Sequence, residues 1–263
     1  MTIYEKNSLE NNADQFWDTF VTEVTNHNRF NPVHPLPEFL KSYLSSHTQY
    51  LNKDTILYRA RIIDYDKSGN NSTGIAKFIR NEEYEPFEGY DEKNSFVPPA
   101  SVVSAGRANP ERIVYLYVAV EAVTAIGETR PRIDDHISVA KIQLLKNICL
   151  ADLTQSVRSN TDNVEEMKIQ RIIRAFSRPC RDPIEYIPTQ YIAEYIKSLG
   201  FDGLMFKSSF VPGGTNITIF NPNVAKPIAS APYRMDGIVY RARRIPPLKD
   251  IDAFDIIVSN TKN

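Results

Sequence analysis

The pattern of hydrophobic positions is clearest between Ile113 and Pro131, where the chain reads IVYLYVAVEAVTAIGETRP. Every residue from 113 to 119 is apolar or aromatic, as in strands buried on both faces, so this segment is predicted to be central in a sheet. Residues 121–129 then predict a short helix. A carboxylate near the end of that helix, Glu128, would look into a cleft at the edge of the sheet.

Apolar residues recur at helical spacing in four other segments. Two of them, 13–25 and 36–44, are joined through a loop at residues 27–37 that has three prolines, and their apolar faces are expected to pack on the main domain. The third segment is 163–178. The fourth begins near Thr189, a suitable N-cap, and ends before Gly200, a natural residue for the left-handed C′ position.

Runs of β-branched and aromatic residues predict the remaining strands, at 54–63, 138–144, 201–209, 216–220 and 237–245. Residues 64–104 form a long insertion with little periodicity, which is either functional or has structure that the pattern does not reveal. We therefore expect an N-terminal helical element over residues 1–52 and a main domain over residues 53–263 that contains the insertion.

The composition narrows the class of protein. The chain has 263 residues, 42% of them hydrophobic, and a formal net charge of −1, which allows a real core but gives no support for a surface that coats nucleic acid. Its two cysteines, Cys149 and Cys180, form no CxxC pair and no disulfide framework, which favours a reducing cytoplasm. No apolar run approaches the roughly 20 residues that span a bilayer, and the polar N-terminus lacks a signal core. We expect a soluble, cytoplasmic protein.

Several common site chemistries find no support in the sequence. It contains no GxxxxGK[ST] phosphate loop, no GxGxxG and no GxSxG elbow. The four histidines are scattered without metal-binding spacing, so no metal site is predicted.

Arginines in or beside strands are the first chemical signal, because arginine is costly to bury unless it meets an anion. For Arg61, an exposed sheet face or a structural ion pair is the better interpretation. For Arg59, and for Arg107 in the turn Gly106–Pro110, a binding role and a structural role are equally open. Each signal is weak by itself, and the order of the segments along the chain carries the information.

Four segments in this order resemble the RES domain family: YRAR at 58–61, GRANP at 106–110, YLYVAVEAVTAIGE at 115–128, and FDGLMFKSSFVPGGTNITIFNP at 201–222. The resemblance covers about residues 53–223, which leaves the N-terminal helices and a tail from Ala225 as additions. It implies an α+β fold similar to that of ADP-ribosyltransferases, with a strongly bent mixed sheet and helices around a nicotinamide cleft.

The resemblance also implies roles for individual residues. The family's arginine falls on Arg59, its glutamate on Glu128 and its serine on Ser208, which would be the catalytic residues. The expected substrate-binding residues are Tyr58, Arg107, Tyr117, Ser209 as the alternative serine, and Asn216. Arginine suits an anionic pyrophosphate, an aromatic ring can stack on a cationic pyridinium, and a carboxylate can stabilise an oxocarbenium-like transition state.

The function implied by the resemblance is consumption of NAD+ by a bacterial toxin or defence effector. The enzyme would cleave the nicotinamide–ribose bond by hydrolysis or phosphorolysis, and protein mono-ADP-ribosylation is the alternative. A nucleotide-binding module without turnover is disfavoured, because all four expected side chains are present. NAD+ is then a substrate rather than a cofactor, with inorganic phosphate as an optional co-substrate. The expected partner is a helix-turn-helix antitoxin rather than nucleic acid or a membrane, and a homodimer is compatible with the sequence.

Overall fold

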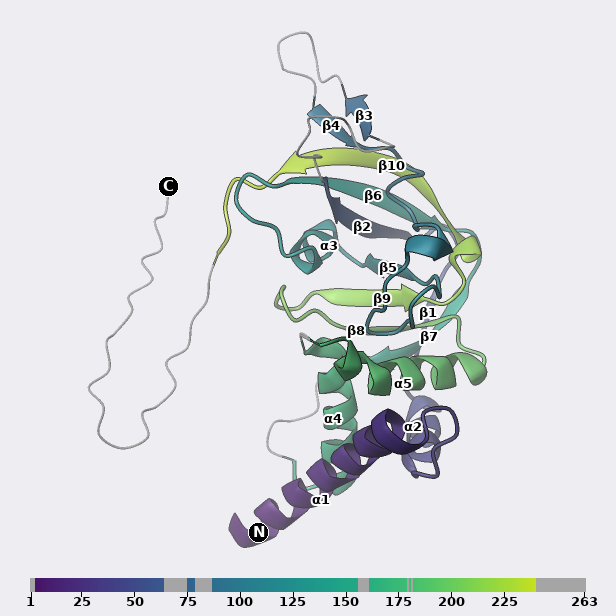
Figure 1. Ribbon diagram of the computed structural model, residues 1–263, viewed down its shortest axis with the longest axis vertical. Coiled ribbons are helices and arrows are strands. Elements are labelled where there is room, and N and C mark those ends of the chain that lie inside the picture. The colour runs from purple at the N-terminus through teal and green to yellow at the C-terminus, as the bar shows by residue number, and fades with distance from the viewer. Residues whose placement is uncertain are drawn as a thin grey trace, which may run out of the picture.

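The computed structural model describes residues 3–63, 75–78, 87–155, 161–178, 180 and 182–239, and Figure 1 shows their arrangement. Their main feature is an eight-stranded sheet. From one edge to the other its strands are β1 (Thr48–Leu51), β7 (Ile148–Leu153), β8 (Gly203–Lys207), β9 (Thr215–Ile219), β5 (Leu116–Ala119), β2 (Ile56–Ile62), β6 (His136–Leu144) and β10 (Ala225–Arg234). Within the sheet, β7 and β8 run parallel and the other neighbours antiparallel. This mixed sheet with flanking helices confirms the predicted α+β class.

The sheet bends back on itself because two of its strand pairs form one continuous ladder. β2 pairs with β6 and β1 pairs with β7, and residues 52–55 and 145–147 separate the two pairs. Leu144 bridges this gap, since its carbonyl accepts from the N–H of Asp54 at 2.9 Å and its own N–H donates to the carbonyl of Thr55 at 3.0 Å. The ladder therefore runs through the bend and connects the two ends of the sheet.

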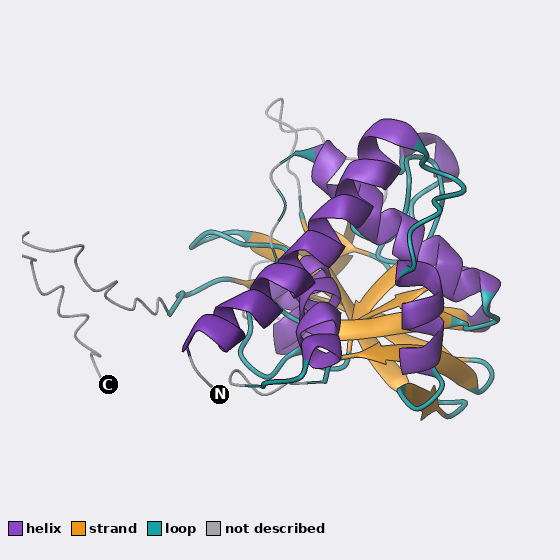
Figure 2. Ribbon diagram, turned by 90° about the horizontal axis from the view of Figure 1, so that it is seen from below, coloured by secondary structure: helices purple, strands orange, loops and turns teal. Residues whose placement is uncertain are grey.

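Helices gather at the end of the sheet that holds β7 and β8 (Figure 1, Figure 2). They are α1 (Ile3–Thr22), which a π-helical turn (Glu23–His27) continues, α2 (Leu36–Leu44), α4 (Val164–Ser177) and α5 (Ile187–Ser198). A fifth helix, α3 (Ala122–Glu128), lies instead against β2 and β5.

The smaller elements lie around the main sheet. A hairpin of β3 (Ile75–Phe78) and β4 (Phe87–Tyr90) lies within the predicted insertion and packs beside β10 and β6. Short 3₁₀ helices occupy Ala100–Val102, Pro183–Tyr186 and Pro222–Val224. The hairpin gives part of the insertion a regular structure that its weak periodicity did not predict.

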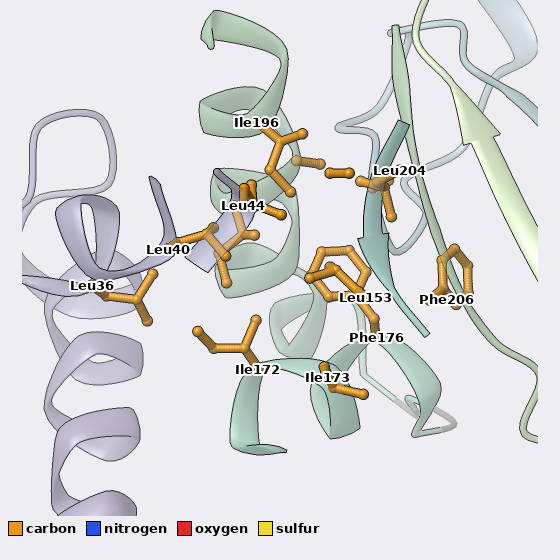
Figure 3. Packing of buried hydrophobic residues seen from close by; sticks show 14 of the residues in the cluster. Leu36, Leu40, Leu44, Leu153, Ile172, Ile173, Phe176, Ile196, Leu204 and Phe206 are labelled. Carbon is orange, nitrogen blue, oxygen red and sulfur yellow. The ribbon is translucent and has the colours of Figure 1, made fainter. Parts of the chain in front are cut away.

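The gathered helices and one face of the sheet share a hydrophobic core, shown in Figure 3. From α2, Leu36, Leu40 and Leu44 enter it and are at most 1% exposed. They meet Ile172 and Phe176 of α4, both fully buried. Burial of each such side chain is worth about 1.5–3 kcal/mol. The prediction that the N-terminal helices pack on the main domain is confirmed.

A second core fills the inside of the bent sheet. Leu116 and Val118 of β5 join it, together with Ile142 of β6 and Ile217 of β9. Tyr115, just before β5, is buried in the first core instead. β5 is therefore covered on both faces and lies between β9 and β2, so the prediction of a central strand is confirmed.

The predicted helices are present, with one error at a cap. α1 begins earlier than predicted, at Ile3, because its first turns are too polar to show an apolar stripe. α5 follows Tyr186 rather than Thr189. Thr189 is buried inside the helix, and its hydroxyl donates to the carbonyl of Tyr186 at 3.1 Å. Gly200 has a φ of +93°, as its predicted C′ position requires.

The tail from Ala225 was expected to lie beyond the segments that resemble the family, although still within the main domain of residues 53–263. Residues 225–234 form β10, which pairs with β6 at one edge of the sheet. A strand was expected at 237–245 instead; residues 237–239 are not in a strand, and the rest of that segment lies outside the described residues. β1 and β7 were not predicted.

The N-terminal 52 residues contribute more than helices, since β1 belongs to the main sheet. The division of the chain at residue 52 stays a prediction. Among the described residues, none of the helices combines the length and apolar character that a membrane crossing requires.

Candidate active site

A cavity of about 290 Å³ lies where the sheet opens between β2 and β5. These two strands pair at one position, Tyr58 with Ala119. Beyond it they separate, and side chains from both strands, from α3 and from β9 line the space. Six of the predicted site residues belong to the lining: Tyr58, Arg59, Arg107, Tyr117, Glu128 and Asn216.

Glu128 is held through one of its two carboxylate oxygens. The hydroxyl of Ser208 and the side-chain amide of Asn216 both donate to Oε1, each at 2.6 Å. Among the described residues, no donor reaches Oε2. Two fixed donors on one oxygen orient the carboxylate and leave the other oxygen available to a ligand in the cavity.

Ser208 acts on Glu128 rather than lining the cavity. Its Oγ accepts from the backbone N–H groups of Phe210 at 3.1 Å and Val211 at 3.0 Å. Because these donors occupy the oxygen's lone pairs, the hydroxyl proton is directed to Glu128. Ser209, the alternative serine, is exposed and outside the cavity lining.

Two glycines let α3 approach the loop that carries Ser208. A Cβ on Gly127 would lie 2.5 Å from Cγ2 of Val211, and a Cβ on Gly214 would lie 2.5 Å from Oγ1 of Thr124. Both distances are shorter than side-chain contacts allow. This close approach brings Glu128, at the end of α3, within hydrogen-bond distance of Ser208.

The turn Gly106–Pro110 fixes Tyr117. The tyrosine hydroxyl donates to Oδ1 of Asn109 at 2.7 Å and accepts from the N–H of Ala108 at 2.9 Å. A Cβ on Gly106 would lie 2.5 Å from Asn109 Oδ1, so this position requires glycine. Burial raises the pKa of Tyr117 to about 12, which keeps its hydroxyl neutral.

Arg59 spans the opening between the two strands. Its Nη1 donates to the carbonyl of Tyr117 at 3.0 Å, which replaces a backbone hydrogen bond between β2 and β5. Burial lowers the pKa of Arg59 to about 10, and the nearby charge of Arg61 adds to this effect. Arg59 Nε is buried and has no hydrogen-bond partner among the described residues.

Arg107, a predicted site residue, and Arg61, for which a structural role was preferred, both contact backbone carbonyls. Arg107 donates through Nη1 to the carbonyl of Phe176 and through Nη2 to that of Arg178 at 2.8 Å, at the C-terminal end of α4. These hydrogen bonds hold the C-terminal end of α4 against Arg107, which lines the cavity. Arg61 donates to the carbonyl of Asn94, lies over the ring of Tyr90 and does not line the cavity.

The cavity also contains residues that sequence reasoning missed. Arg130, Thr129, Tyr186 and Phe206 belong to its lining. Arg130 follows Glu128 by two positions, so its place beside the carboxylate was available as a signal. Tyr186 comes from a segment 58 residues after Glu128 and gave no signal. Within the described part of the chain, no group of His, Cys, Asp or Glu side chains is arranged to hold a metal ion.

The chain is similar to a protein-family model and to a solved structure. The family model described as the RES domain matches residues 82–236. The match begins inside the predicted insertion, after Arg59, and includes β10, whereas about residues 53–223 were expected. The crystal structure of the M. tuberculosis MbcT–MbcA toxin–antitoxin complex aligns with a TM-score of 0.39 and 12% identity, over 75% of this chain and 93% of that one. No curated protein matches the chain significantly.

Proposed function

Because the chain belongs to the RES domain family, we propose that it cleaves the bond between nicotinamide and ribose in NAD+. One observation carries this proposal. The carboxylate of Glu128 lines a cavity beside three arginines, and Ser208 and Asn216 hold its Oε1. The arginines favour an anionic substrate, and the oriented carboxylate favours a reaction that develops positive charge.

Cleavage of this bond requires mainly electrostatic stabilisation of the transition state by the protein. When the N-glycosidic bond breaks, nicotinamide leaves as a neutral base and the ribose becomes oxocarbenium-like. Oε2 of Glu128 stabilises that positive charge or holds the ribose hydroxyls, as carboxylates do in glycosidases. Ser208 and Asn216 keep the carboxylate in place, so it need not reorganise during the reaction.

Tyr117 supplies an aromatic surface for the cationic nicotinamide ring. Its hydroxyl is fixed by Asn109 and Ala108, so the ring has a set orientation in the lining. A cation over an aromatic face is attracted by about 0.5–2 kcal/mol. The attraction disappears once nicotinamide leaves uncharged, which favours release of this product.

The size of the cavity limits how much of the substrate it encloses. At about 290 Å³ it lies at the lower end of the range for small-molecule pockets, roughly 300–1,000 Å³. It suits the nicotinamide and its ribose, while the adenosine half lies outside. The acceptor is water or inorganic phosphate and enters from the ribose face opposite nicotinamide.

The proposed activity also implies a role for the protein as a toxin. Loss of NAD+ makes the chain toxic to the cell that produces it, and a helix-turn-helix antitoxin that covers the cavity would restrain it. Membership of the RES family supports this role. The partner would act at the rim, where Arg130 and Phe210 are exposed.

The decisive experiment measures nicotinamide release from NAD+ by the purified chain, with and without phosphate. The wild type is expected to release nicotinamide, and Glu128→Gln is expected to lose at least about 100-fold in kcat, the typical loss for one stabilising group. Dependence on phosphate separates phosphorolysis from hydrolysis. Glu121→Gln is the matched control, because Glu121 is exposed on the same segment and outside the lining. Intact NAD+ with wild-type protein would refute the proposal, and label transferred to a protein in lysate would favour ADP-ribosylation.

A further inference from the structure

The three arginines of the cavity differ in what they contact. Arg59 donates to the carbonyl of Tyr117, and Arg107 donates to two carbonyls at the end of α4. Arg130 lines the same cavity, yet among the described residues its guanidinium has no hydrogen bond and no ion pair. It is also exposed, so its N–H groups remain accessible to a ligand.

The guanidinium of Arg130 is nevertheless held in place. Its Cζ lies 4.7 Å from the centroid of the Phe210 ring. Stacking covers a face of the guanidinium and leaves its N–H edge free to donate. Arg130 follows the helix that carries Glu128, and Phe210 belongs to the loop that carries Ser208. The pair therefore joins the two segments that hold the carboxylate.

The backbone conformation at Arg130 is unfavourable for a residue with a side chain. Arg130 has a φ of +53° and follows the C-cap of α3. That left-handed position after a helix strongly favours glycine, and an L side chain is disfavoured there. Arginine at this position makes the helix end less stable, and strain of this kind is concentrated at functional sites.

We propose that Arg130, supported by Phe210, binds the pyrophosphate of the dinucleotide and so selects NAD+ over nicotinamide compounds that lack phosphate. This inference rests on the proposed function and names the residue that binds the anionic part of the substrate. It assigns the pyrophosphate to Arg130 rather than to Arg59, which donates to the carbonyl of Tyr117, and the catalytic role expected for Arg59 stays a prediction. Arginine suits the task because its planar fork donates paired hydrogen bonds to phosphate oxygens.

The first test measures ADP-ribose binding by calorimetry, because ADP-ribose has the pyrophosphate but no nicotinamide bond to cleave. Arg130→Gln is expected to weaken binding by about 10- to 100-fold, the loss that corresponds to a charge-assisted hydrogen-bond pair. Arg132→Gln is the matched control, since Arg132 is exposed and outside the lining, and it should change binding less than about twofold. In turnover, Arg130→Gln should raise KM for NAD+ with kcat nearly unchanged. The ratio of kcat/KM for NAD+ to that for nicotinamide riboside should fall by the same factor.

Arg130→Gly separates binding from folding. Glycine relieves the left-handed backbone, so Tm should stay equal or rise while ADP-ribose binding weakens as in Arg130→Gln. Unchanged ADP-ribose affinity in Arg130→Gln would overturn the proposal, as would an equal loss in Arg132→Gln or a wild type that does not bind ADP-ribose. A lower Tm in Arg130→Gly would assign the side chain a structural role. Arg130-dependent ADP-ribose binding without NAD+ cleavage would support the inference while the proposed function fails.

Discussion

At the scale of single residues, Ser208 is a positioning residue for the carboxylate. Its oxygen takes two backbone N–H donors and its proton goes to Glu128. The resemblance to the RES family had implied contact between this serine and the substrate. In the structure Ser208 donates to Glu128 and lies outside the cavity lining, and its contact with the substrate stays a prediction.

Removing the hydroxyl should therefore affect the rate more than substrate affinity. Ser208→Ala is expected to lower kcat by about 10- to 100-fold, as for other residues that orient a reactive group, with KM little changed. It also leaves two N–H groups without their acceptor, which costs about 1–3 kcal/mol of stability. Steady-state kinetics and thermal unfolding measure the two effects.

The neighbouring serine provides the control. Ser209→Ala should match the wild type in both measurements, because Ser209 is exposed and outside the cavity lining. If Ser209→Ala loses activity while Ser208→Ala keeps it, the assignment of the family serine to Ser208 is wrong.

At the scale of elements, the site depends on how closely α3 approaches the loop of residues 208–214. Gly127 permits this approach, since its Cβ position lies 2.5 Å from Cγ2 of Val211. Alanine in a helix is worth about 1 kcal/mol more than glycine. Overpacking costs about 1–3 kcal/mol, and valine has little rotamer freedom with which to relieve it. The clash is therefore the larger effect.

Gly127→Ala is expected to reduce stability by up to about 2 kcal/mol, the difference between these two effects. It should also lower kcat, because the loop moves away and the bond from Ser208 to Glu128 lengthens. Val211→Ala removes the clashing methyl groups, so the double variant Gly127→Ala/Val211→Ala should recover most of the rate. A double variant no more active than Gly127→Ala would show that the loss has another cause.

The elements that sequence patterns predicted are those whose burial is regular. β5 was predicted from seven consecutive apolar positions, and α4 from its stripe of Met167, Ile172, Ile173 and Phe176. β10 was missed because Pro227 and Pro232 are typical of loops. At the edge of a sheet, proline is tolerated where its missing N–H faces away from the neighbouring strand.

Part of the site was predictable from the order of segments along the chain. Glu128, Ser208 and Asn216 lie in segments whose order matches a family, and they do converge. The contacts of Arg107 were not predictable, because the carbonyls it binds lie 69 and 71 residues further along the chain. Such a pairing depends on where α4 ends in space, which no local pattern encodes.

At the scale of the whole molecule, the N-terminal helices α1 and α2 are joined to each other through His34, in the loop between them. Its Nδ1 accepts from the N–H of Leu36 at 3.1 Å, and Nε2 lies 3.2 Å from the hydroxyl of Thr19. The rings of Phe16 and Phe20 pack against it. Burial is the main cause that lowers the pKa of His34 below its usual 6.5, Lys168 lowers it further, and Glu23 opposes both.

This lowered pKa makes stability depend on pH. As pH falls below 6.5, the unfolded chain binds a proton at His34 before the folded chain does. The contribution of neutral His34 is therefore complete above this pH and is lost as pH decreases toward the folded-state value. We expect the free energy of unfolding, measured in denaturant, to decrease over this range. His34→Gln should flatten that decrease, and an unchanged pH profile in this variant would contradict the assignment.

The single position at which β2 and β5 pair has a further consequence, for internal motion. Along the rest of the bent sheet several residue pairs hold each junction, whereas here Tyr58 pairs with Ala119 and Arg59 reaches the carbonyl of Tyr117. Widening the sheet at this junction breaks few hydrogen bonds, so we expect it to open more readily than the junctions held by several residue pairs. Opening motions of the sheet are thereby concentrated at the cavity, where the proposed function requires substrate to enter and nicotinamide to leave. Amide protons of β2 and β5 beside this junction should exchange with solvent before those of β6 and β9.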